Sequence, residues 1–335
     1  MDERENIPMT SVYRAVGLAL TLTLLSTLAS NGPAAAAGYP DKPVRVVIPF
    51  AAGGVADITA RIVADKLGSK LGQRFYIENL PGAGGIAAAR AVISARADGY
   101  TLALLTNGTA ISVSLFEKLP FDPLRDFAPV SSLGFFDFIL ATGADSPYKT
   151  LGDFIAAARA RPGTLNVGTI NVGSTQNLSA ELFKTAAGID FAIVPYRGTP
   201  EVAVSLLQGN IALMIDSYAS IKGNLAEGKI RSLASSGPVR SASTPDVATV
   251  GESGVADYDV ESWNALFAPA ATPPDVVNTL NGALQEVLAD ADVKQHLLEL
   301  GIEARASTPQ EIAGRLKSDI DKWRKVIEKA GIQKQ

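Results

Sequence analysis

The fold is decided by a glycine-rich turn, Pro49-Phe50-Ala51-Ala52-Gly53-Gly54-Val55-Ala56-Asp57, between an apolar segment and an alanine-rich one. The apolar segment before it, 44–48, predicts a buried strand, and the segment after it, about 56–71, predicts a helix. Glycines at such a turn leave backbone N–H groups uncovered, and the helix dipole adds partial positive charge there. The turn is therefore typical of a site that binds a small anion.

A second turn of the same kind follows, Asn79-Leu80-Pro81-Gly82-Ala83-Gly84-Gly85, between a predicted strand at 75–77 and a predicted helix at about 86–95. Two such turns close together would bind a small anion without arginine or a metal, which points to ligand capture rather than to chemistry. Gly82, Gly84 and Ala87 also fit the dinucleotide pattern G-x-G-x-x-A. In dinucleotide-binding folds that pattern follows the first strand, and an acidic residue ends the next strand. Here it follows the second predicted strand and the acidic residue is missing, so it argues only weakly for a nucleotide.

Strand-like and helix-like segments alternate along the rest of the chain, which predicts an α/β fold of mostly parallel sheets with helices on both faces. Ligands in such folds bind beyond the carboxyl ends of the strands. We expect strands at 100–105, 138–142, 164–168, 192–195, 211–215, 230–233 and 263–267, and helices at 151–160, 174–187, 274–289 and 309–329. A further helix should start near Thr199, which can cap it, with Pro200 in its first turn.

Composition excludes several classes of function. The chain has 335 residues, a net charge of −4, one histidine and no cysteine. A zinc–thiolate site, a thiol nucleophile and a disulfide framework therefore cannot form, and non-specific binding to nucleic acid is disfavoured. The length predicts two lobes. We expect no cofactor, no metal and no nucleic-acid partner.

The N-terminus has the pattern of a secretory signal. Arg14 precedes an apolar run at 15–28, Asn31-Gly32-Pro33 ends the run, and Ala34-Ala35-Ala36 supplies small residues for cleavage. The run is short for a membrane span, which is the alternative. We expect residues 1–37 to be a signal peptide, cleaved near Ala36 or Ala37, and the protein to be periplasmic. Met1 and Met9 both remain candidate initiators.

A series of motifs resembles the solute receptors of tripartite tricarboxylate transporters, the Bug family, over essentially the whole chain after residue 37. They occur in the order and spacing typical of that family. The motifs are Tyr39-Pro40-Asp41-Lys42-Pro43, the two glycine turns, Asp98-Gly99-Tyr100-Thr101-Leu102, Asp126-Phe127-Ala128-Pro129-Val130, Val194-Pro195-Tyr196-Arg197-Gly198, and Asp216.

The resemblance implies a periplasmic-binding-protein fold of type II kind, with a ligand cleft between two α/β lobes. The lobes are expected at 38–142 plus 258–335 and at 143–257. It further implies capture of a small carboxylate by a monomer that serves membrane transporter subunits. The residues expected at the ligand are Phe50, Ala52, Gly53, Gly54, Asp57, Gly84, Gly85, Thr106 and Asn107 from the first lobe, and Gly173, Ser174, Thr175, Gln176, Arg197, Gly198 and Asp216 from the second.

The sequence departs from the family pattern at five positions that bear on the ligand. The family usually has prolines where Ala51 and Ala52 stand, arginine where Leu80 stands and lysine where Arg197 stands. It commonly has histidine where Gln176 stands, and an amide offers different donors and acceptors and does not titrate. The identity of the carboxylate therefore stays open among dicarboxylates, aromatic acids and amino or hydroxy acids.

Each proposed contact also has a purely structural interpretation. The glycines can simply allow tight turns, Ser174 and Thr175 can be helix caps, and Asp216 can tie down a strand end. Two other functions share the scaffold. One is an exported sensor that reports to a membrane kinase, and the other is an exported hydrolase or isomerase, for which Asp57 and Asp216 are the only candidate acid–base couple. Against the enzyme, the chain has no G-x-S-x-G motif.

Overall fold

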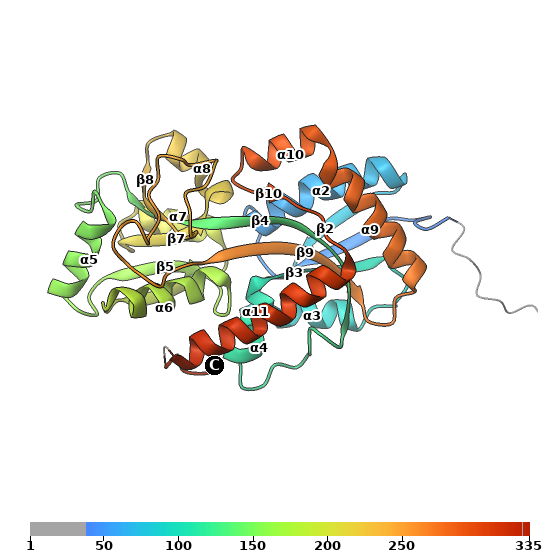
Figure 1. Ribbon diagram of the computed structural model, residues 1–335, viewed down its shortest axis with the longest axis horizontal. Helices are drawn as coiled ribbons and strands as arrows, with labels where there is room; N and C mark the ends of the chain where they lie inside the picture. Colours follow the sequence, from blue (N-terminus) through green and yellow to red (C-terminus); the bar gives the residue numbers. More distant parts are fainter. Residues whose placement is uncertain (1–37, 330) are drawn as a thin grey trace, which may run out of the picture. The chain divides into compact units, whose positions relative to one another are not determined.

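A mixed ten-stranded sheet organises the part of the chain that the structure describes (Figure 1). The structure is a computed structural model, and it describes residues 38–329 and 331–335. The predicted signal peptide, residues 1–37, lies outside the described residues. Residues 40–335 form one unit, to which the following description applies.

The strands follow each other across the sheet in the order β2-β1-β3-β9-β4-β7-β5-β6, and β8 and β10 each pair with β4. β2, β1 and β3 are parallel neighbours, as are β7, β5 and β6, whereas β9 and β4 run antiparallel through the middle. The strands are β1 (Val44–Ile48), β2 (Phe75–Asn79), β3 (Thr101–Thr106), β4 (Phe127–Gly143), β5 (Asn166–Ile170), β6 (Ala192–Tyr196), β7 (Leu213–Ser217), β8 (Ile230–Ser235), β9 (Glu261–Pro269) and β10 (Glu303–Ala304).

Helices cover both faces of the sheet (Figure 1). α3, α4 and α11 lie together on one side, with α2, α9 and α10 on the other. The helices are α2 (Val55–Leu71), α3 (Ile86–Ile93), α4 (Asn107–Leu115), α5 (Leu151–Ala160), α6 (Thr175–Ala187), α7 (Thr199–Leu207), α8 (Tyr218–Ala226), α9 (Pro274–Ala289), α10 (Ala291–Leu298) and α11 (Pro309–Lys329), with a short 3-10 turn, η1 (Ala83–Gly85), before α3.

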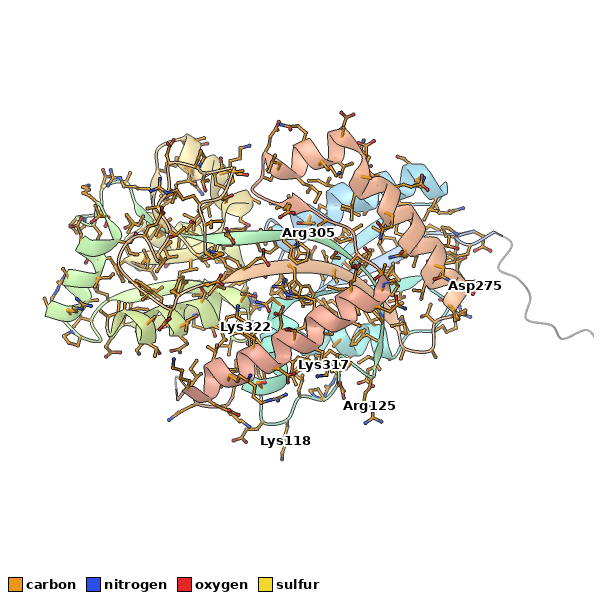
Figure 2. The ribbon with its side chains drawn as sticks, in the orientation of Figure 1. Lys118, Arg125, Asp275, Arg305, Lys317 and Lys322 are labelled. Atoms are coloured by element: carbon orange, nitrogen blue, oxygen red, sulfur yellow. The ribbon has the colours of Figure 1, made fainter. Side chains whose placement is uncertain are left out.

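Two apolar clusters stabilise this arrangement. One joins β3 and β9 to α3, α4 and α11, with Trp263, Phe267 and Leu316 buried inside it. The other joins the end of β4 to β5, β7, α7 and α8 around Met214 and Ile221. The opposite face of α11 is charged, and Lys317 and Lys322 on it are exposed (Figure 2). Among the described residues, no helix is both long and apolar enough to cross a membrane.

The expected α/β class with helices on both faces is confirmed, but the sheet is mixed rather than mostly parallel. The difference comes from β4, a 17-residue strand of which only 138–142 was expected. Its first part pairs with β9 and its last part with β7 and β8. Pro129, the serines at 131 and 132 and Gly134 hide this strand in the sequence, because they interrupt the apolar pattern. The lobe boundaries near 142 and 257 stay a prediction.

Two helix starts differ from expectation. No helix was expected directly after the strand at 100–105, but Thr106 caps α4 there, and its hydroxyl and that of Thr109 form a capping box. Thr199 was expected to cap α7, but the N-cap is Gly198 and makes no side-chain bond. The Thr199 hydroxyl instead donates a hydrogen bond to the buried carboxyl group of Asp216.

Candidate functional site

The first glycine turn exposes the N-terminus of α2. Gly54 is the N-cap, and as a glycine it has no side chain to cap the helix. The N–H of Ile58 donates to the Gly54 carbonyl at 3.0 Å. The N–H groups of Val55 and Ala56 therefore have no partner among the described residues. Gly53 has φ +85°, a conformation that favours glycine. The turn thus presents free donors at the positive end of a 17-residue helix.

Asp57 shapes this turn from within. Its carboxylate accepts hydrogen bonds from the N–H of Gly53 at 3.0 Å, Arg61 Nε at 2.9 Å and Asn79 Nδ2 at 3.1 Å. Burial raises the pKa of Asp57, but the hydrogen bonds from Arg61, Gly53 and Asn79 outweigh burial and lower its pKa below the usual value. The residue is buried and ionised, with protein donors on both oxygens. It therefore fixes the turn and does not face either pocket described below.

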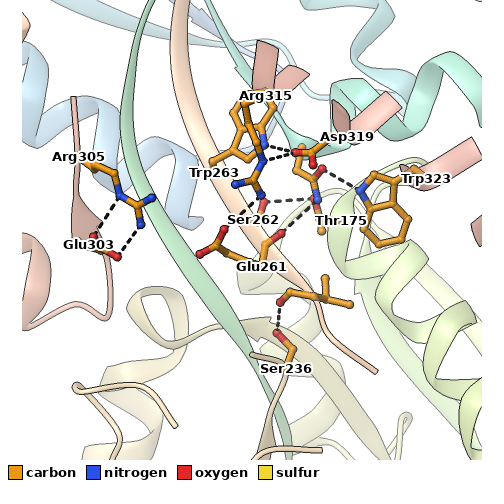
Figure 3. Close-up of polar contacts among 12 residues, drawn as sticks. Thr175, Ser236, Glu261, Ser262, Trp263, Glu303, Arg305, Arg315, Asp319 and Trp323 are labelled. Atoms are coloured by element: carbon orange, nitrogen blue, oxygen red, sulfur yellow. Dashed lines mark hydrogen bonds and ion pairs between the residues drawn. The ribbon is translucent and has the colours of Figure 1, made fainter. Parts of the chain in front are cut away.

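A second helix N-terminus, that of α6, offers the same chemistry. Ser174 is its N-cap, and its hydroxyl accepts from the N–H of Asn177 at 3.1 Å. The N–H groups of Thr175 and Gln176 are left without a partner among the described residues. The Thr175 hydroxyl lies 3.3 Å from the Ser262 hydroxyl of β9 (Figure 3). Ser174 thus caps the helix, as one interpretation of the sequence proposed, and the cap leaves donors free in front of it.

These two helix N-termini open onto one pocket. Its wall is part apolar and part uncharged polar, and it contains no acidic or basic side chain. The lining residues are Phe50, Gly54, Val55, Ala56, Thr106, Phe136, Ile170, Thr175, Gln176, Thr199, Ser262 and Asn264. We call this hollow the α2–α6 pocket.

Asp216 lies behind this pocket. It is fully buried and accepts hydrogen bonds from Thr199 Oγ1 at 2.6 Å, Gln176 Nε2 at 3.3 Å and its neighbour's N–H, that of Ser217, at 2.8 Å. Burial raises the pKa of Asp216 to about 6, although the bonds from Thr199, Ser217 and Gln176 lower it in part. Asp216 therefore positions two residues of the pocket wall.

A second hollow adjoins it, and we call it the glycine pocket. Its walls approach closely, since the N–H of Gly84 donates to the carbonyl of Val172 at 3.3 Å. A Cβ atom on Gly84 or Gly173 would lie 3.0 Å from the ring of Phe116, and both residues have positive φ. The lining residues are Pro49, Phe50, Gly82, Gly84, Gly85, Thr106, Gly108, Thr109, Ser112, Asn171, Val172, Gly173 and Ser174.

The structure brings together many of the residues expected at the ligand. Nine of them line one or both pockets: Phe50, Gly54, Gly84, Gly85, Thr106, Gly173, Ser174, Thr175 and Gln176. Seven line neither: Ala52, Gly53, Asp57, Asn107, Arg197, Gly198 and Asp216.

Asn107 and Arg197 show why some expected residues lie elsewhere. The amide oxygen of Asn107 accepts from Trp323 Nε1 of α11 at 2.8 Å, and its Nδ2 donates to the carbonyl of Glu261 at 3.4 Å. Asn107 therefore joins α4 to α11 and β9. Arg197 is exposed, and its backbone N–H donates to Glu201 at 3.2 Å. The expected contact of Arg197 with the ligand stays a prediction.

Sequence reasoning missed several wall residues of the α2–α6 pocket, among them Phe136, Thr199, Ser262 and Asn264. A signal for two of them exists in β9. Ser262 and Asn264 alternate with the core residues Trp263, Ala265 and Phe267, so the polar positions lie on the opposite face of the strand. Among the described residues, no group of three histidine, aspartate or glutamate side chains is arranged to hold a metal ion.

The sequence model of the tripartite tricarboxylate transporter family receptor matches residues 59–332. The chain belongs to this receptor family. It is 30% identical to the protein BugT of Bordetella pertussis over 325 residues, which cover 96% of this chain and 98% of BugT. The family is one of periplasmic solute-binding receptors, which accords with a site built of helix N-termini and uncharged side chains.

Two solved structures that are similar to this chain contain a ligand. The R. palustris protein Rpa4515 with adipate is 34% identical, with a TM-score of 0.86 and coverage of 89% of this chain and 100% of that one. MatC (Rpa3494) from Rhodopseudomonas palustris with bound malate is 33% identical, with a TM-score of 0.82 and coverage of 86% and 100%. Each of these two similar proteins is thus seen with a small dicarboxylate.

Proposed function

We propose that this receptor captures one small carboxylate in the α2–α6 pocket and delivers it to a tripartite tricarboxylate-type transporter. The observation that carries the proposal is the convergence of two helix N-termini with free N–H groups, Val55 and Ala56 on α2 and Thr175 and Gln176 on α6, on one uncharged pocket. Aligned N–H groups and helix dipoles stabilise a carboxylate without a basic side chain. The ligands of Rpa4515 and MatC support this choice of chemistry.

Binding without a covalent step agrees with the side chains present. Asp57 and Asp216, the only acid–base couple considered, are both occupied by protein donors. His296 lies on α10, outside both pockets. We therefore propose a monomeric binding protein rather than a hydrolase or isomerase.

The experiment is thermal unfolding of the purified protein with a panel of mono-, di-, aromatic and amino-carboxylates. A ligand at a hundred times its dissociation constant should stabilise the protein by about 2.7 kcal/mol and raise the melting temperature by several degrees. A selective shift would support the proposal. A panel without any shift, from protein shown by native mass spectrometry to be free of ligand, would refute it.

A matched pair of variants tests the pocket itself. A Cβ atom at Gly54 would lie 3.6 Å from Thr199 Oγ1, so the side chain of Gly54→Leu would enter the α2–α6 pocket without a backbone clash. Gly152 on α5 is the control, since its Cβ position also lies 3.6 Å from a threonine hydroxyl, that of Thr150, outside both pockets. Gly54→Leu should abolish the thermal shift and Gly152→Leu should keep it.

Transport and export are separate parts of the proposal. Deletion of the gene should abolish uptake of the identified carboxylate if the receptor serves transport. Loss of a transcriptional response with normal uptake would instead favour the exported sensor. N-terminal sequencing of the secreted protein should find a start just after Ala36 or Ala37 if residues 1–37 are a signal peptide.

A further inference from the structure

The floor of the α2–α6 pocket contains a buried hydrogen-bond acceptor that no protein group uses. Asn264 lines the pocket and is 0% exposed, on the polar face of β9 that it shares with Ser262. Its side-chain oxygen Oδ1 is buried and has no partner among the described residues. An unsatisfied buried carbonyl costs free energy, so this atom favours any ligand that brings a donor to it.

The orientation of the Asn264 amide is fixed by its neighbour. Thr59 Oγ1 donates its single hydrogen to the carbonyl of Val55 at 2.7 Å. It therefore acts as an acceptor toward Asn264, whose Nδ2 lies 3.1 Å away. Exchange of the amide oxygen and nitrogen would bring two acceptors together, so Oδ1 must be the atom that is left unpaired.

Gln176 supplies a second acceptor by the same logic. Its Nε2 donates to the carboxylate of Asp216 at 3.3 Å, and an ionised carboxylate only accepts. The amide oxygen of Gln176 is thus directed away from Asp216 and has no partner among the described residues. The pocket wall therefore offers free backbone donors at the two helix ends and two free amide oxygens.

A carboxylate satisfies only the donors of this set, because it has no hydrogen to give. On a small carboxylate ligand, a hydroxyl or an ammonium group can bring a hydrogen to the oxygen of Asn264. An ammonium group would be buried in a pocket whose wall contains no acidic side chain, which is unfavourable. A hydroxyl group gives one hydrogen, carries no charge and fits the wall.

We infer that the ligand carries a hydroxyl group beside its captured carboxylate, and that Asn264 Oδ1 accepts the hydrogen of this hydroxyl. Asn264 is then the residue that separates hydroxycarboxylates from plain carboxylates. The inference rests on the proposed function, since it assumes that the carboxylate binds at the ends of α2 and α6.

The test is calorimetric titration of the purified protein with two matched sets: succinate, malate and aspartate, and phenylacetate, mandelate and phenylglycine. In a set that binds, we expect the hydroxy member to bind about tenfold or more tightly than the plain one. Equal affinity of the plain and hydroxy members, or tightest binding by the amino member, would overturn the inference and leave carboxylate capture standing. No binding by any member of either set or of the wider carboxylate panel would overturn both.

Two leucine variants assign the preference to Asn264. Asn264→Leu removes the free oxygen and should reduce the preference for the hydroxy member to less than about twofold. Asn281→Leu is the control: Asn281 Nδ2 also donates to protein groups, the carbonyls of Val130 and Ser307, both at 2.8 Å, and it lies outside both pockets. Asn281→Leu should keep the preference. A preference that survives in Asn264→Leu would refute the role of Asn264, and the wild-type comparison decides the ligand class even if this variant does not fold.

Discussion

Thr199 Oγ1 donates a 2.6 Å hydrogen bond to Asp216 Oδ2, so a carboxyl group that does not line the pocket determines how its wall is oriented. Asp216 at the end of β7 also holds Gln176 of α6. One buried acid therefore connects the starts of two helices, α6 and α7, to strand β7.

The first prediction concerns the pH dependence that Asp216 gives to stability. Its pKa is raised by burial to about 6 in the folded protein, from an ordinary value of 3.8. Between these values the folded state binds more protons than the unfolded state, so the free energy of unfolding should fall as pH rises from about 4 to 6. The contribution is about 2–3 kcal/mol. Asp216→Asn should remove it, as measured by urea unfolding at pH 4, 5, 6 and 7.

The control for this experiment is Asp65→Asn, at an exposed position on α2. This variant should follow the wild-type curve of stability against pH. If Asp216→Asn also follows the wild-type curve, the carboxyl group is not the one that titrates in this range.

The second prediction concerns Asp137 in β4, which lies opposite Glu261 of β9 in the antiparallel register. Burial, with the nearby charges of Glu261 and Asp259, raises the pKa of Asp137 to about 7. The raised pKa means that this residue stabilises the fold when protonated and that the stabilisation is lost as pH rises from about 4 through 7. At pH 8, Asp137→Asn should therefore be more stable than wild type by about 2–4 kcal/mol.

Urea unfolding at pH 4 and pH 8 tests this directly. The advantage of Asp137→Asn should be small at pH 4, where the carboxyl group is protonated in the folded wild type and close to its titration midpoint in the unfolded chain. Asp259→Asn removes one neighbouring charge and should give a smaller gain at pH 8. A variant no more stable than wild type at pH 8 would show that the acidic pair costs the fold nothing.

The third prediction separates structure from binding at Asn107. This residue was expected to contact the ligand, but its amide joins Trp323 and the Glu261 carbonyl. Asn107→Ala leaves the buried Trp323 N–H unpaired, so the free energy of unfolding should fall by about 1–3 kcal/mol. The affinity for the carboxylate should stay within about twofold, because the side chain lines neither pocket. A large loss of affinity at unchanged stability would restore the expected role.

Much of the fold could be predicted because its signals are local. α2, α5, α9 and α11 match the expected helices closely, since apolar periodicity and capping residues belong to single segments. β4 could not be predicted in full, because its pairing with β9 joins residues more than a hundred positions apart. The antiparallel centre of the sheet arises from that non-local pairing.

The candidate site also divides into features with local signals, which could be predicted, and features that depend on tertiary contacts, which could not. The glycine turns and the Ser174 cap were predictable, because glycine and serine act on their own backbone. Asp57, Asn107 and Asp216 were expected at the ligand, but the structure uses their side chains to hold neighbouring elements. Asn264 and Thr199 were missed, since only tertiary contact with Thr59 and Asp216 gives each its place in the pocket wall.

The last prediction concerns the contact between the first glycine turn and the start of α7. A Cβ atom at Gly198 would lie 2.7 Å from the Cβ of Ala51, too close for either to remain in place. Gly198 has extended backbone, so Gly198→Ala should cause no backbone strain but push the two segments apart beside the α2–α6 pocket. Affinity for the carboxylate should fall about tenfold or more.

The compensating variant is Ala51→Gly, which removes the clashing methyl group. The Cα atom of residue 51 lies 3.7 Å from the Cβ position of residue 198, an ordinary contact. The double variant Ala51→Gly/Gly198→Ala should therefore bind within about threefold of wild type. Titration of wild type, both single variants and the double variant forms a complete cycle, and additive losses in the double variant would show that this contact does not hold the pocket together.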